Sequence, residues 1–222
     1  MEALVRRREG GEPLAWLVGG VEFCGLRVRV HPGVYVPRWQ TEALAERAAS
    51  LLPPAGAAVD LCTGAGAVAA VLQARHPAAT VVATDIDPAA VACARANGVD
   101  AVAGDLDGPL PARLLGSVDV ITAVVPYVPT EELVFLPRDV VAFEPRRALD
   151  GGARGLGVLS AAVERSARWL RPGGWLLLEI GGGQAAPLTA AMARVGFEQI
   201  SVLRDAEGDD RAIEGRRRPA PS

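Results

Sequence analysis

From residue 57 to residue 180, short runs of apolar residues alternate with longer stretches that repeat at helical spacing. Several runs are apolar almost throughout, which is typical of parallel strands that are covered on both faces. The runs predict strands at Ala57–Leu61, Thr80–Thr84, Asp100–Ala103, Val118–Val124 and Trp175–Ile180. The stretches between them predict helices at 66–75, 88–97 and 156–170. This order indicates a doubly wound, Rossmann-like α/β sheet.

The C-terminal part departs from this alternation. A helix is predicted at 184–195, and two strand-like runs follow it at Phe197–Leu203 and Arg211–Gly215. These runs are close enough along the chain to pair antiparallel. The charged stretch from Asp205 to Arg211 is expected to be a solvated turn. The sheet is therefore predicted to be mostly parallel, with an antiparallel C-terminal strand.

The first 52 residues carry a different pattern. Residues 2–20 predict short helical pieces, and residues 21–37 alternate around Gly25 and Pro32 and predict a β-hairpin. Residues 39–51 predict a helix that stops before a pair of prolines. The chain is thus divided into an N-terminal helical segment with a hairpin, one α/β domain and a solvated tail. The predicted boundaries are 1–52, 53–216 and 217–222.

Composition narrows the class of protein. Half of the 222 residues are hydrophobic, which is sufficient for a sizeable core. The formal net charge of −3 argues against a partner held by neutralised phosphates, so no nucleic acid is expected. Because no apolar run approaches the roughly 18 residues of a membrane span, no membrane partner is expected either. The three cysteines suit neither a disulfide framework nor a metal site, which is typical of a reduced, cytoplasmic protein without a metal.

The most informative segment is the loop that ends the first predicted strand and opens the next helix. It reads Asp60, Leu61, Cys62, Thr63, Gly64, Ala65 and Gly66. Small residues let a backbone approach a ligand closely, and a helix N-terminus offers unpaired N–H groups. Asp85 follows 21 residues after Gly64, where a carboxylate accepts hydrogen bonds from both hydroxyls of a ribose. The next strand is followed by Asp105 and Leu106, where a side chain would meet an adenine edge.

Two cofactors share these features. Gly64-x-Gly66-x-x-Ala69 also fits the loose dinucleotide fingerprint, so a nicotinamide-dependent oxidoreductase is an alternative. Asp60 favours S-adenosylmethionine, because its carboxylate would orient the cationic amino-acid end of that methyl donor and would sit poorly beside a pyrophosphate. The antiparallel C-terminal pair and the lack of an evident second catalytic domain point the same way. An S-adenosylmethionine-dependent methyltransferase is therefore the favoured interpretation.

Further motifs extend the pattern over almost the whole chain from Gly11. They are Gly-Glu-Pro-Leu-Ala-Trp at 11–16, Glu-Phe-x-Gly-Leu at 22–26, Pro-Arg-x-x-Thr-Glu at 37–42, Val-Val-Pro-Tyr at 124–127, Glu-Pro-Arg-x-Ala-Leu-Asp-Gly-Gly at 144–152, Leu-x-Pro-Gly-Gly at 170–174 and Leu-Glu-Ile-Gly-x-x-Gln at 178–184. With these motifs the chain resembles the HemK/PrmC-type protein-(glutamine-N5) methyltransferases. This family, which belongs to the class I S-adenosylmethionine-dependent methyltransferases, methylates the glutamine of a Gly-Gly-Gln loop in peptide-chain release factors.

The resemblance implies S-adenosylmethionine as cofactor, S-adenosylhomocysteine as product and a release-factor-like protein as methyl acceptor. The expected cofactor contacts are Asp60, Cys62, Thr63, Gly64, Ala65, Gly66, Asp85, Ile86, Asp105, Leu106 and Val124. By the same resemblance, Val124, Val125, Pro126 and Tyr127 hold the acceptor amide. Arg38, Trp39 and Tyr127 are expected to form the substrate side of the site.

One departure from the family matters chemically. The family pattern at 124–127 is Asn-Pro-Pro-Tyr, whose Asn oxygen and a backbone carbonyl can accept both hydrogens of an amide and hold its nitrogen in line with the donor methyl. Val124 offers no side-chain acceptor, which leaves the backbone carbonyls of 124 and 125. One unpaired amide hydrogen costs roughly 1–3 kcal/mol, or about ten- to a hundredfold in rate. A water or Gln40 is an alternative acceptor.

Other departures agree with a changed acceptor. Trp39 and Gln40 stand where the family usually has proline and an acidic residue, and Arg154 stands where an acidic residue is usual. Few residues precede the hairpin, where the family has a helical domain that helps to grip the release factor. Three interpretations remain: glutamine methylation with an altered acceptor pocket, methylation of another acceptor such as a small molecule, and a cofactor-binding protein that has lost catalysis.

Overall fold

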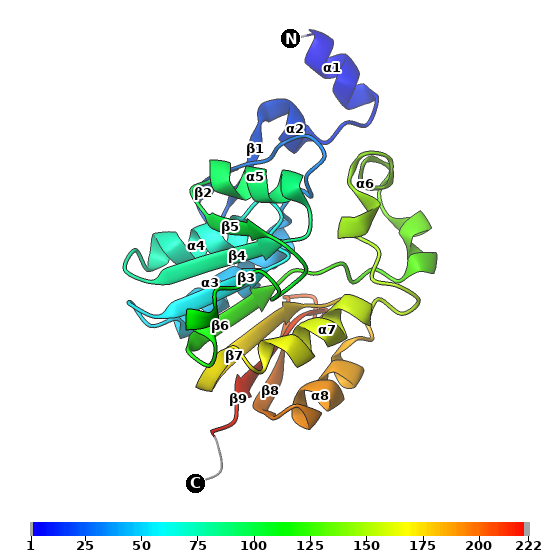
Figure 1. Cartoon of the computed structure of the whole chain (residues 1–222). Helices are drawn as coiled ribbons and strands as arrows, with labels where there is room; N and C mark the ends of the chain where they lie inside the picture. Colours follow the sequence, from blue (N-terminus) through cyan, green and yellow to red (C-terminus); the bar gives the residue numbers. More distant parts are fainter. Residues whose placement is uncertain (1, 220–222) are drawn as a thin grey trace.

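The computed structural model describes residues 2–219 and contains a seven-stranded sheet between two layers of helices (Figure 1). The strands, in sheet order, are β5 (Asp100–Ala103), β4 (Thr80–Asp85), β3 (Ala57–Leu61), β6 (Val118–Ala123), β7 (Leu170–Glu179), β9 (Asp210–Arg217) and β8 (Phe197–Arg204). The first five pair in parallel, whereas β9 is antiparallel to both β7 and β8. The predicted class, a mostly parallel, doubly wound sheet with an antiparallel C-terminal strand, is confirmed.

Neighbouring residues on each strand pack against opposite layers. Ala58 of β3 and Leu177 of β7 belong to one apolar cluster, which includes residues of α3 (Glu42–Leu51), α4 (Ala67–Arg75) and α5 (Pro88–Ala96). Val59 and Leu176, one residue away on the same strands, belong to a second cluster with α7 (Gly157–Ser166) and α8 (Ala185–Arg194). Because both faces of the sheet are covered, the parallel strands are mostly apolar, and this is why nearly continuous apolar runs located them.

The N-terminal segment forms α1 (Glu2–Glu9), α2 (Leu14–Val18), β1 (Gly20–Phe23), β2 (Leu26–Arg29) and the 3-10 turn η1 (Trp39–Thr41) that precedes α3. The hairpin predicted over 21–37 is wrong in its extent, because β1 and β2 pair only between Gly20 and Arg29. Residues 30–38 continue as an unpaired segment in which Pro32 and Pro37 lack the N–H that a ladder needs.

The single asparagine of the chain ties this hairpin to the loop after β3. Asn97, the residue after α5, accepts a hydrogen bond from the Arg29 N–H (2.9 Å). Its side-chain amide donates to the carbonyls of Arg29 (2.9 Å) and Ala65 (2.8 Å). All its hydrogen-bonding atoms therefore hold the scaffold together, and Asn97 does not replace the missing acceptor at position 124.

Three predicted boundaries in the C-terminal part of the chain are wrong. The helix expected over 156–170 ends at Ser166, and β7 begins at Leu170 rather than at Trp175. Trp169 accounts for this, because its indole N–H donates to the buried Asp107 (2.8 Å) and its carbonyl accepts from Val118 N–H (3.0 Å). The expected tail also begins too early, since Arg217 belongs to β9, while residues 220–222 lie outside the described residues.

No helix or strand was predicted in the segment between β6 and α7, which folds into short pieces. They are η3 (Thr130–Phe135), α6 (Arg138–Phe143) and η4 (Arg146–Ala148); a similar turn, η2 (Ala112–Leu114), precedes β6. Each piece after β6 follows a proline, so none is long enough to show a helical period. Leu133, Val140 and Leu149 form a small apolar cluster of their own, against which Tyr35 packs.

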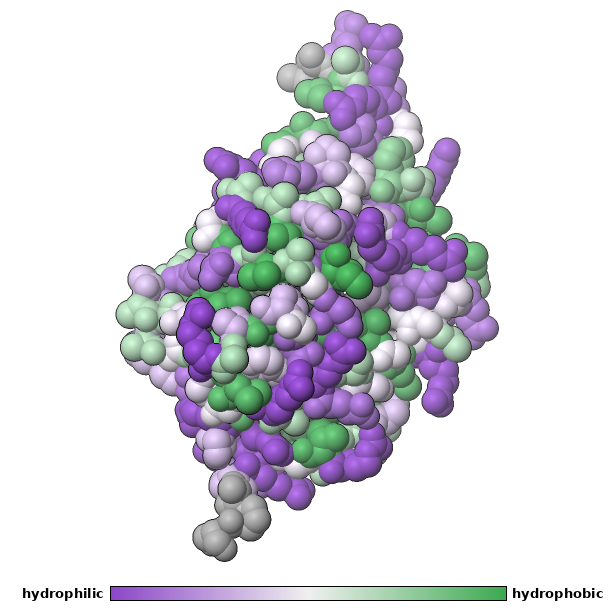
Figure 2. Space-filling model, viewed as in Figure 1, coloured by the Kyte–Doolittle hydropathy of each residue, from purple (hydrophilic) through white to green (hydrophobic). Residues whose placement is uncertain are grey.

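Helix α1 packs only lightly on the rest of the chain. None of its residues is buried, and its surface is mainly hydrophilic where it projects from the molecule (Figure 2). Arg8 pairs with Asp139 of α6 (3.4 Å), and Trp16 packs edge-on against Phe143 at a centroid distance of 6.4 Å. The N-terminal segment therefore rests on the segment between β6 and α7. None of the helices in residues 2–219 is long and apolar enough to cross a membrane.

Candidate active site

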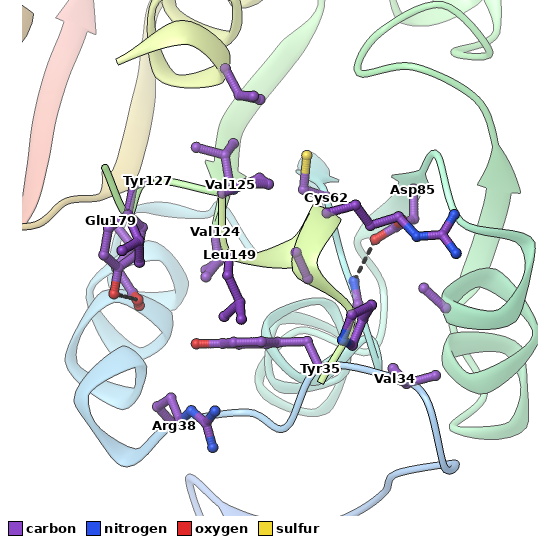
Figure 3. Close-up of a pocket in the computed structure, with 18 of the residues that line it drawn as sticks. Val34, Tyr35, Arg38, Cys62, Asp85, Val124, Val125, Tyr127, Leu149 and Glu179 are labelled. Atoms are coloured by element: carbon purple, nitrogen blue, oxygen red, sulfur yellow. Dashed lines mark hydrogen bonds between the residues drawn. The ribbon is translucent and has the colours of Figure 1, made fainter. Parts of the chain in front are cut away.

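A cavity of about 760 Å³ opens at the carboxyl ends of the parallel strands (Figure 3). Its wall includes one residue at or just after the end of each of β3, β4, β5, β6 and β7, namely Cys62, Asp85, Asp105, Val124 and Glu179. The strand order reverses beside β3, and open α/β sheets bind ligands at such a switch point. The volume also falls in the range of roughly 300–1,000 Å³ that is typical of small-molecule sites.

Asp85 fixes the loop on one side of this cavity. Its Oδ2 accepts a hydrogen bond from Gly64 N–H (2.9 Å), and its Oδ1 accepts one from Asp87 N–H (2.8 Å). Burial raises the pKa of Asp85, although both N–H groups oppose that rise. Since a carboxylate has about four acceptor positions, two remain for a ligand's hydroxyl groups.

The rim beside Asp85 contains the other residues predicted from strand ends. Ile86 is 62% exposed and lines the opening. The Asp105 carboxylate pairs with Arg165 (2.8 Å), and the Leu106 side chain is buried against the cavity with a backbone φ of 47°. The predicted residues from β4 and β5 therefore do meet on one wall.

The predicted orientation of Asp60 is wrong. Its side chain is buried and does not line the cavity. Oδ2 accepts from the Thr63 hydroxyl (2.6 Å), and Oδ1 accepts from the Thr122 hydroxyl of β6 (2.7 Å). Burial raises the pKa of Asp60 to about 6. The carboxylate thus links β3, β6 and the loop from behind, instead of facing a ligand.

Three other loop residues that were expected to contact a cofactor, Thr63, Ala65 and Gly66, also lie off the cavity wall. Gly66 has a φ of 81°, and a Cβ there would stand 3.0 Å from the Ala94 side chain on α5. Close packing of the loop against α5 explains this glycine.

Cys62 and Gly64 are the loop residues that face the cavity. Cys62 has a φ of 54°, a conformation that few residues other than glycine adopt. Burial raises the pKa of its thiol, so the side chain stays protonated and is a small packing group instead of a nucleophile.

The segment predicted to hold the acceptor lies across the cavity from Asp85, and all four residues from Val124 to Tyr127 line it (Figure 3). Its backbone is held from behind, because the Gln184 side-chain amide donates to the Tyr127 carbonyl (2.7 Å) and accepts from Gly181 N–H (2.8 Å). A Cβ on Gly155 would collide with that same carbonyl. The motifs around 152 and 178–184 therefore fix where this segment sits.

Glu179, which carried no prediction as a site residue, lies beside Tyr127. Its Oε1 accepts from the Tyr127 hydroxyl (3.1 Å), and its Oε2 accepts from the Thr41 hydroxyl (2.5 Å). Burial raises the pKa of both Glu179 and Tyr127. The signal in the sequence was a carboxylate at the end of an otherwise apolar strand.

Arg38, which was predicted for the substrate side, lines the cavity. Its guanidinium pairs with the buried Glu144 (2.5 Å) and stacks over the ring of Tyr35 at 4.9 Å. Trp39 lines the mouth and is 68% exposed, and Gln40 also faces the cavity. Tyr35 was missed because its segment was predicted to be part of the hairpin, whereas it is unpaired and reaches the cavity.

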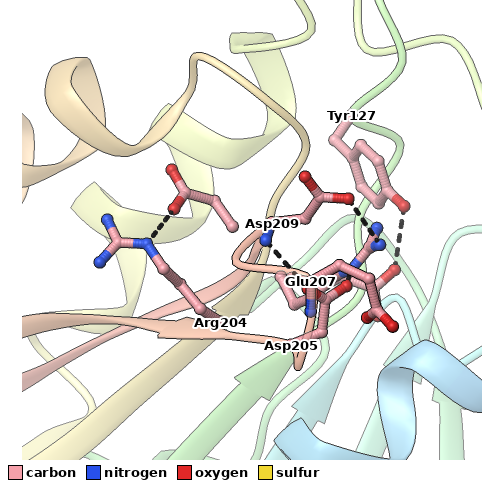
Figure 4. Close-up of polar contacts among 8 residues, drawn as sticks. Tyr127, Arg204, Asp205, Glu207 and Asp209 are labelled. Atoms are coloured by element: carbon pink, nitrogen blue, oxygen red, sulfur yellow. Dashed lines mark hydrogen bonds and ion pairs between the residues drawn. The ribbon is translucent and has the colours of Figure 1, made fainter.

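Arg211 corrects the expectation of a purely solvated turn between β8 and β9. It lines the cavity on the same side as Tyr127. Asp205 and Asp209 of the turn hold its guanidinium at 2.6 Å and 3.2 Å, within the polar cluster drawn in Figure 4. Only the antiparallel placement of β9 beside β7 brings this residue to the site.

The chain is similar to known methyltransferases in sequence and in structure. A family model described as "Methyltransferase small domain" matches residues 25–104. A release factor glutamine methyltransferase of Geobacter sulfurreducens is 38% identical over 96% of this chain and 76% of its own length. One from Moorella thermoacetica is 40% identical, over 96% of this chain and 78% of its own length.

Solved structures agree on the fold. The release factor-specific protein-(glutamine-N5) methyltransferase of Alicyclobacillus acidocaldarius superposes with a TM-score of 0.52 at 23% identity, covering 83% of this chain and 95% of that protein. The sequence similarity, which spans nearly the whole chain, carries the assignment. The chain is a methyltransferase that belongs to the release factor glutamine methyltransferase family.

Proposed function

We propose that this enzyme transfers a methyl group from S-adenosylmethionine to the side-chain amide nitrogen of a glutamine in a release-factor-type protein, and that S-adenosylhomocysteine is the second product. The observation that carries the proposal is the cavity that joins the ends of β3, β4 and β5 to the segment 124–127. A methyltransferase of two substrates needs both binding regions in one enclosed space, so that donor and acceptor meet without intervening water.

The cofactor half fits a nucleoside with a hydroxylated ribose. Asp85 keeps two acceptor positions free while two backbone N–H groups hold it, and Ile86 and Leu106 supply apolar surface for a base. S-adenosylmethionine bound there supplies a methyl group on a sulfonium, which a nitrogen nucleophile accepts. The alternative of a nicotinamide-dependent oxidoreductase rested on the loop glycines alone, and the chain's membership of a methyltransferase family argues against it.

The part of the cavity around residues 124–127 would position the acceptor amide instead of activating it chemically. Gln184 holds the Tyr127 carbonyl at the end of the segment 124–127, which lines the cavity, and Val124 and Val125 offer their backbone carbonyls. Such carbonyls accept hydrogen bonds from an amide N–H and hold the nitrogen for in-line attack. No general base is required, because the nitrogen becomes acidic once the new bond forms and then releases its proton to water.

A second acceptor class, a small molecule, is favoured by one observation. Val124 replaces the side-chain acceptor of the family motif with a methyl surface on the cavity wall. An acceptor with fewer N–H groups than a primary amide would lose nothing there, because no hydrogen would be left unpaired.

Transfer of label from radioactive S-adenosylmethionine tests these options. We expect label in a release factor with an intact Gly-Gly-Gln loop and none in the same factor with that glutamine replaced by alanine. Label that appears only in the small-molecule fraction of an extract would assign the enzyme to the second class. Calorimetric binding of S-adenosylmethionine with no transfer to any acceptor would indicate a binding protein.

A further inference from the structure

We propose that Glu179 is a positioning residue for methyl transfer: its carboxylate anchors the Tyr127 side chain to the turn η1 and so fixes the wall against which the acceptor lies. The inference rests on the proposed function, in which Tyr127 belongs to the segment that holds the acceptor. Glu179 is the last residue of β7 and follows four apolar residues, Trp175–Leu178. It lines the same cavity as Tyr127 without belonging to the motif at 124–127.

The two oxygens of Glu179 bind two different segments of the chain. Oε1 accepts a hydrogen bond from the Tyr127 hydroxyl (3.1 Å), and the two side chains lie side by side in Figure 3. Oε2 accepts from the hydroxyl of Thr41 (2.5 Å), the last residue of η1. The two residues before Thr41, Trp39 and Gln40, line the cavity. One carboxylate therefore ties the acceptor segment to the turn that forms another part of the cavity wall.

The stability of the fold does not explain a carboxylate at this position. Glu179 is 5% exposed, and within residues 2–219 its hydrogen-bond partners are two neutral hydroxyls, with no arginine close enough to form an ion pair. Burial raises the pKa of this carboxyl, although its hydrogen bonds and the charges of Arg211 and Arg38 oppose that rise. An apolar residue would continue β7 at lower cost. Costly buried carboxylates are typical of functional sites, and this one lies in the cavity wall.

The anchored side chain has a place in the transfer step. Tyr127 is held at both ends, because its carbonyl accepts from the Gln184 amide (2.7 Å) and its hydroxyl donates to Glu179. A ring fixed in this way cannot rotate out of the cavity wall, of which it forms part. In-line transfer depends on the position of the nucleophile, and a misplacement of about 1 Å can cost about a hundredfold in rate. Glu179 therefore acts on the rate through Tyr127 and needs no proton transfer of its own.

Two substitutions at Glu179 separate positioning from charge. Glu179→Leu removes both hydrogen-bond acceptors, and we expect kcat for a Gly-Gly-Gln release factor to fall about ten- to a hundredfold, with KM little changed. Glu179→Gln keeps an oxygen for the Tyr127 hydroxyl and offers an amide to the Thr41 oxygen, so kcat should stay within about threefold of the unsubstituted value. Calorimetry with S-adenosylmethionine counts the folded enzyme and should give the same dissociation constant for both variants.

A double-mutant cycle tests the path through the Tyr127 hydroxyl. Tyr127→Phe removes that hydroxyl and keeps the ring. Because Tyr127→Phe and Glu179→Leu break the same hydrogen bond, the double variant should lose much less than the product of the two single losses. The matched control is Ser201→Ala, which removes a hydroxyl bond of the same length (3.1 Å) to another buried carboxylate, Glu214, away from the cavity wall. Its kcat should equal that of the unsubstituted enzyme.

Three results overturn the inference in an enzyme that labels the release factor. They are an unchanged kcat in Glu179→Leu, a Glu179→Gln variant as slow as Glu179→Leu, and single losses that multiply independently in the double variant. If the unsubstituted enzyme binds S-adenosylmethionine but labels no release factor, the proposed function itself fails and the inference fails with it. The reaction of the unsubstituted enzyme therefore distinguishes the two failures.

Discussion

Asp60→Asn separates two roles for the carboxylate behind the loop. Its sequence position suggested a contact with the cationic end of S-adenosylmethionine, whereas both of its oxygens accept from threonine hydroxyls and neither faces the cavity. A direct hydrogen bond to a charged group is worth roughly 1.5–3 kcal/mol, so its loss would weaken binding about ten- to 150-fold. From the observed orientation we expect the dissociation constant to change by less than about threefold.

The same substitution has a pH-dependent effect on stability that can be calculated. Burial raises the pKa of Asp60 from 3.8 to about 6, and two units correspond to about 3 kcal/mol. Because the folded-state pKa is raised, the stabilisation from Asp60 is complete below pH 3.8 and is lost as the pH rises through about 6. Asparagine carries no charge to bury, so Asp60→Asn should gain stability relative to the unsubstituted enzyme above pH 6, by at most about 3 kcal/mol.

Urea unfolding at pH 5 and pH 7.5, together with calorimetry, measures both effects. The difference in stability between Asp60→Asn and the unsubstituted enzyme should become more favourable to the variant at the higher pH. Asp85→Asn is the control, because Asp85 lines the cavity and its variant should bind the cofactor more weakly. A more than tenfold loss of cofactor affinity in a stably folded Asp60→Asn variant would refute the reasoning.

Three further predictions concern the acceptor side and the loop. Val124→Asn alone should raise transfer to a Gly-Gly-Gln substrate by up to about tenfold, since it adds an acceptor for the amide; lower activity with normal cofactor binding would contradict this. Glu144→Gln should lower transfer in steady-state kinetics about tenfold, because Arg38 loses its partner, while the affinity for the cofactor in calorimetry stays unchanged. If transfer and cofactor affinity fall equally, the substitution has caused a general structural defect. Cys62 should react with iodoacetamide at pH 8 far more slowly than a free thiol, because burial raises the pKa of its side chain. Rapid labelling of Cys62 in mass spectrometry would show that its thiol is not buried in this way.

The strands could be predicted from the sequence because their environment is simple. A strand buried on both faces is built mainly from apolar residues, so β3 and β6 stood out as runs that are apolar apart from an aspartate in each and a threonine in β6. The end of α7 could not be predicted in the same way. Trp169 breaks the helix through a bond to Asp107, which lies 62 residues earlier in the chain, and no local pattern contains that partner.

The residues of the candidate site also differ in whether a local sequence pattern could predict them. Gly64 and Asp85, which line the cavity, could be proposed as cofactor contacts because each stands at or shortly after a strand end, a position that the strand pattern itself defines. Asp60 stands at such a position too, yet its direction depends on the Thr122 hydroxyl of another strand, and so its predicted orientation was wrong. Tyr35 and Arg211 lie in segments whose patterns predicted strands and pointed to no site, and only the folded chain brings them to the cavity.

The distribution of these residues indicates which parts of the enzyme set its acceptor. The cofactor wall is built on the ends of β3, β4 and β5, where a change would disturb the core of the sheet. The acceptor wall beyond the motif comes instead from the segment that holds Tyr35 and from the segment between β6 and α7, joined through Glu144 and the cluster around Leu149. Because these segments lie outside the sheet, their residues can vary without loss of the fold. A change of acceptor is therefore most readily accommodated in this wall, away from the ends of β3, β4 and β5.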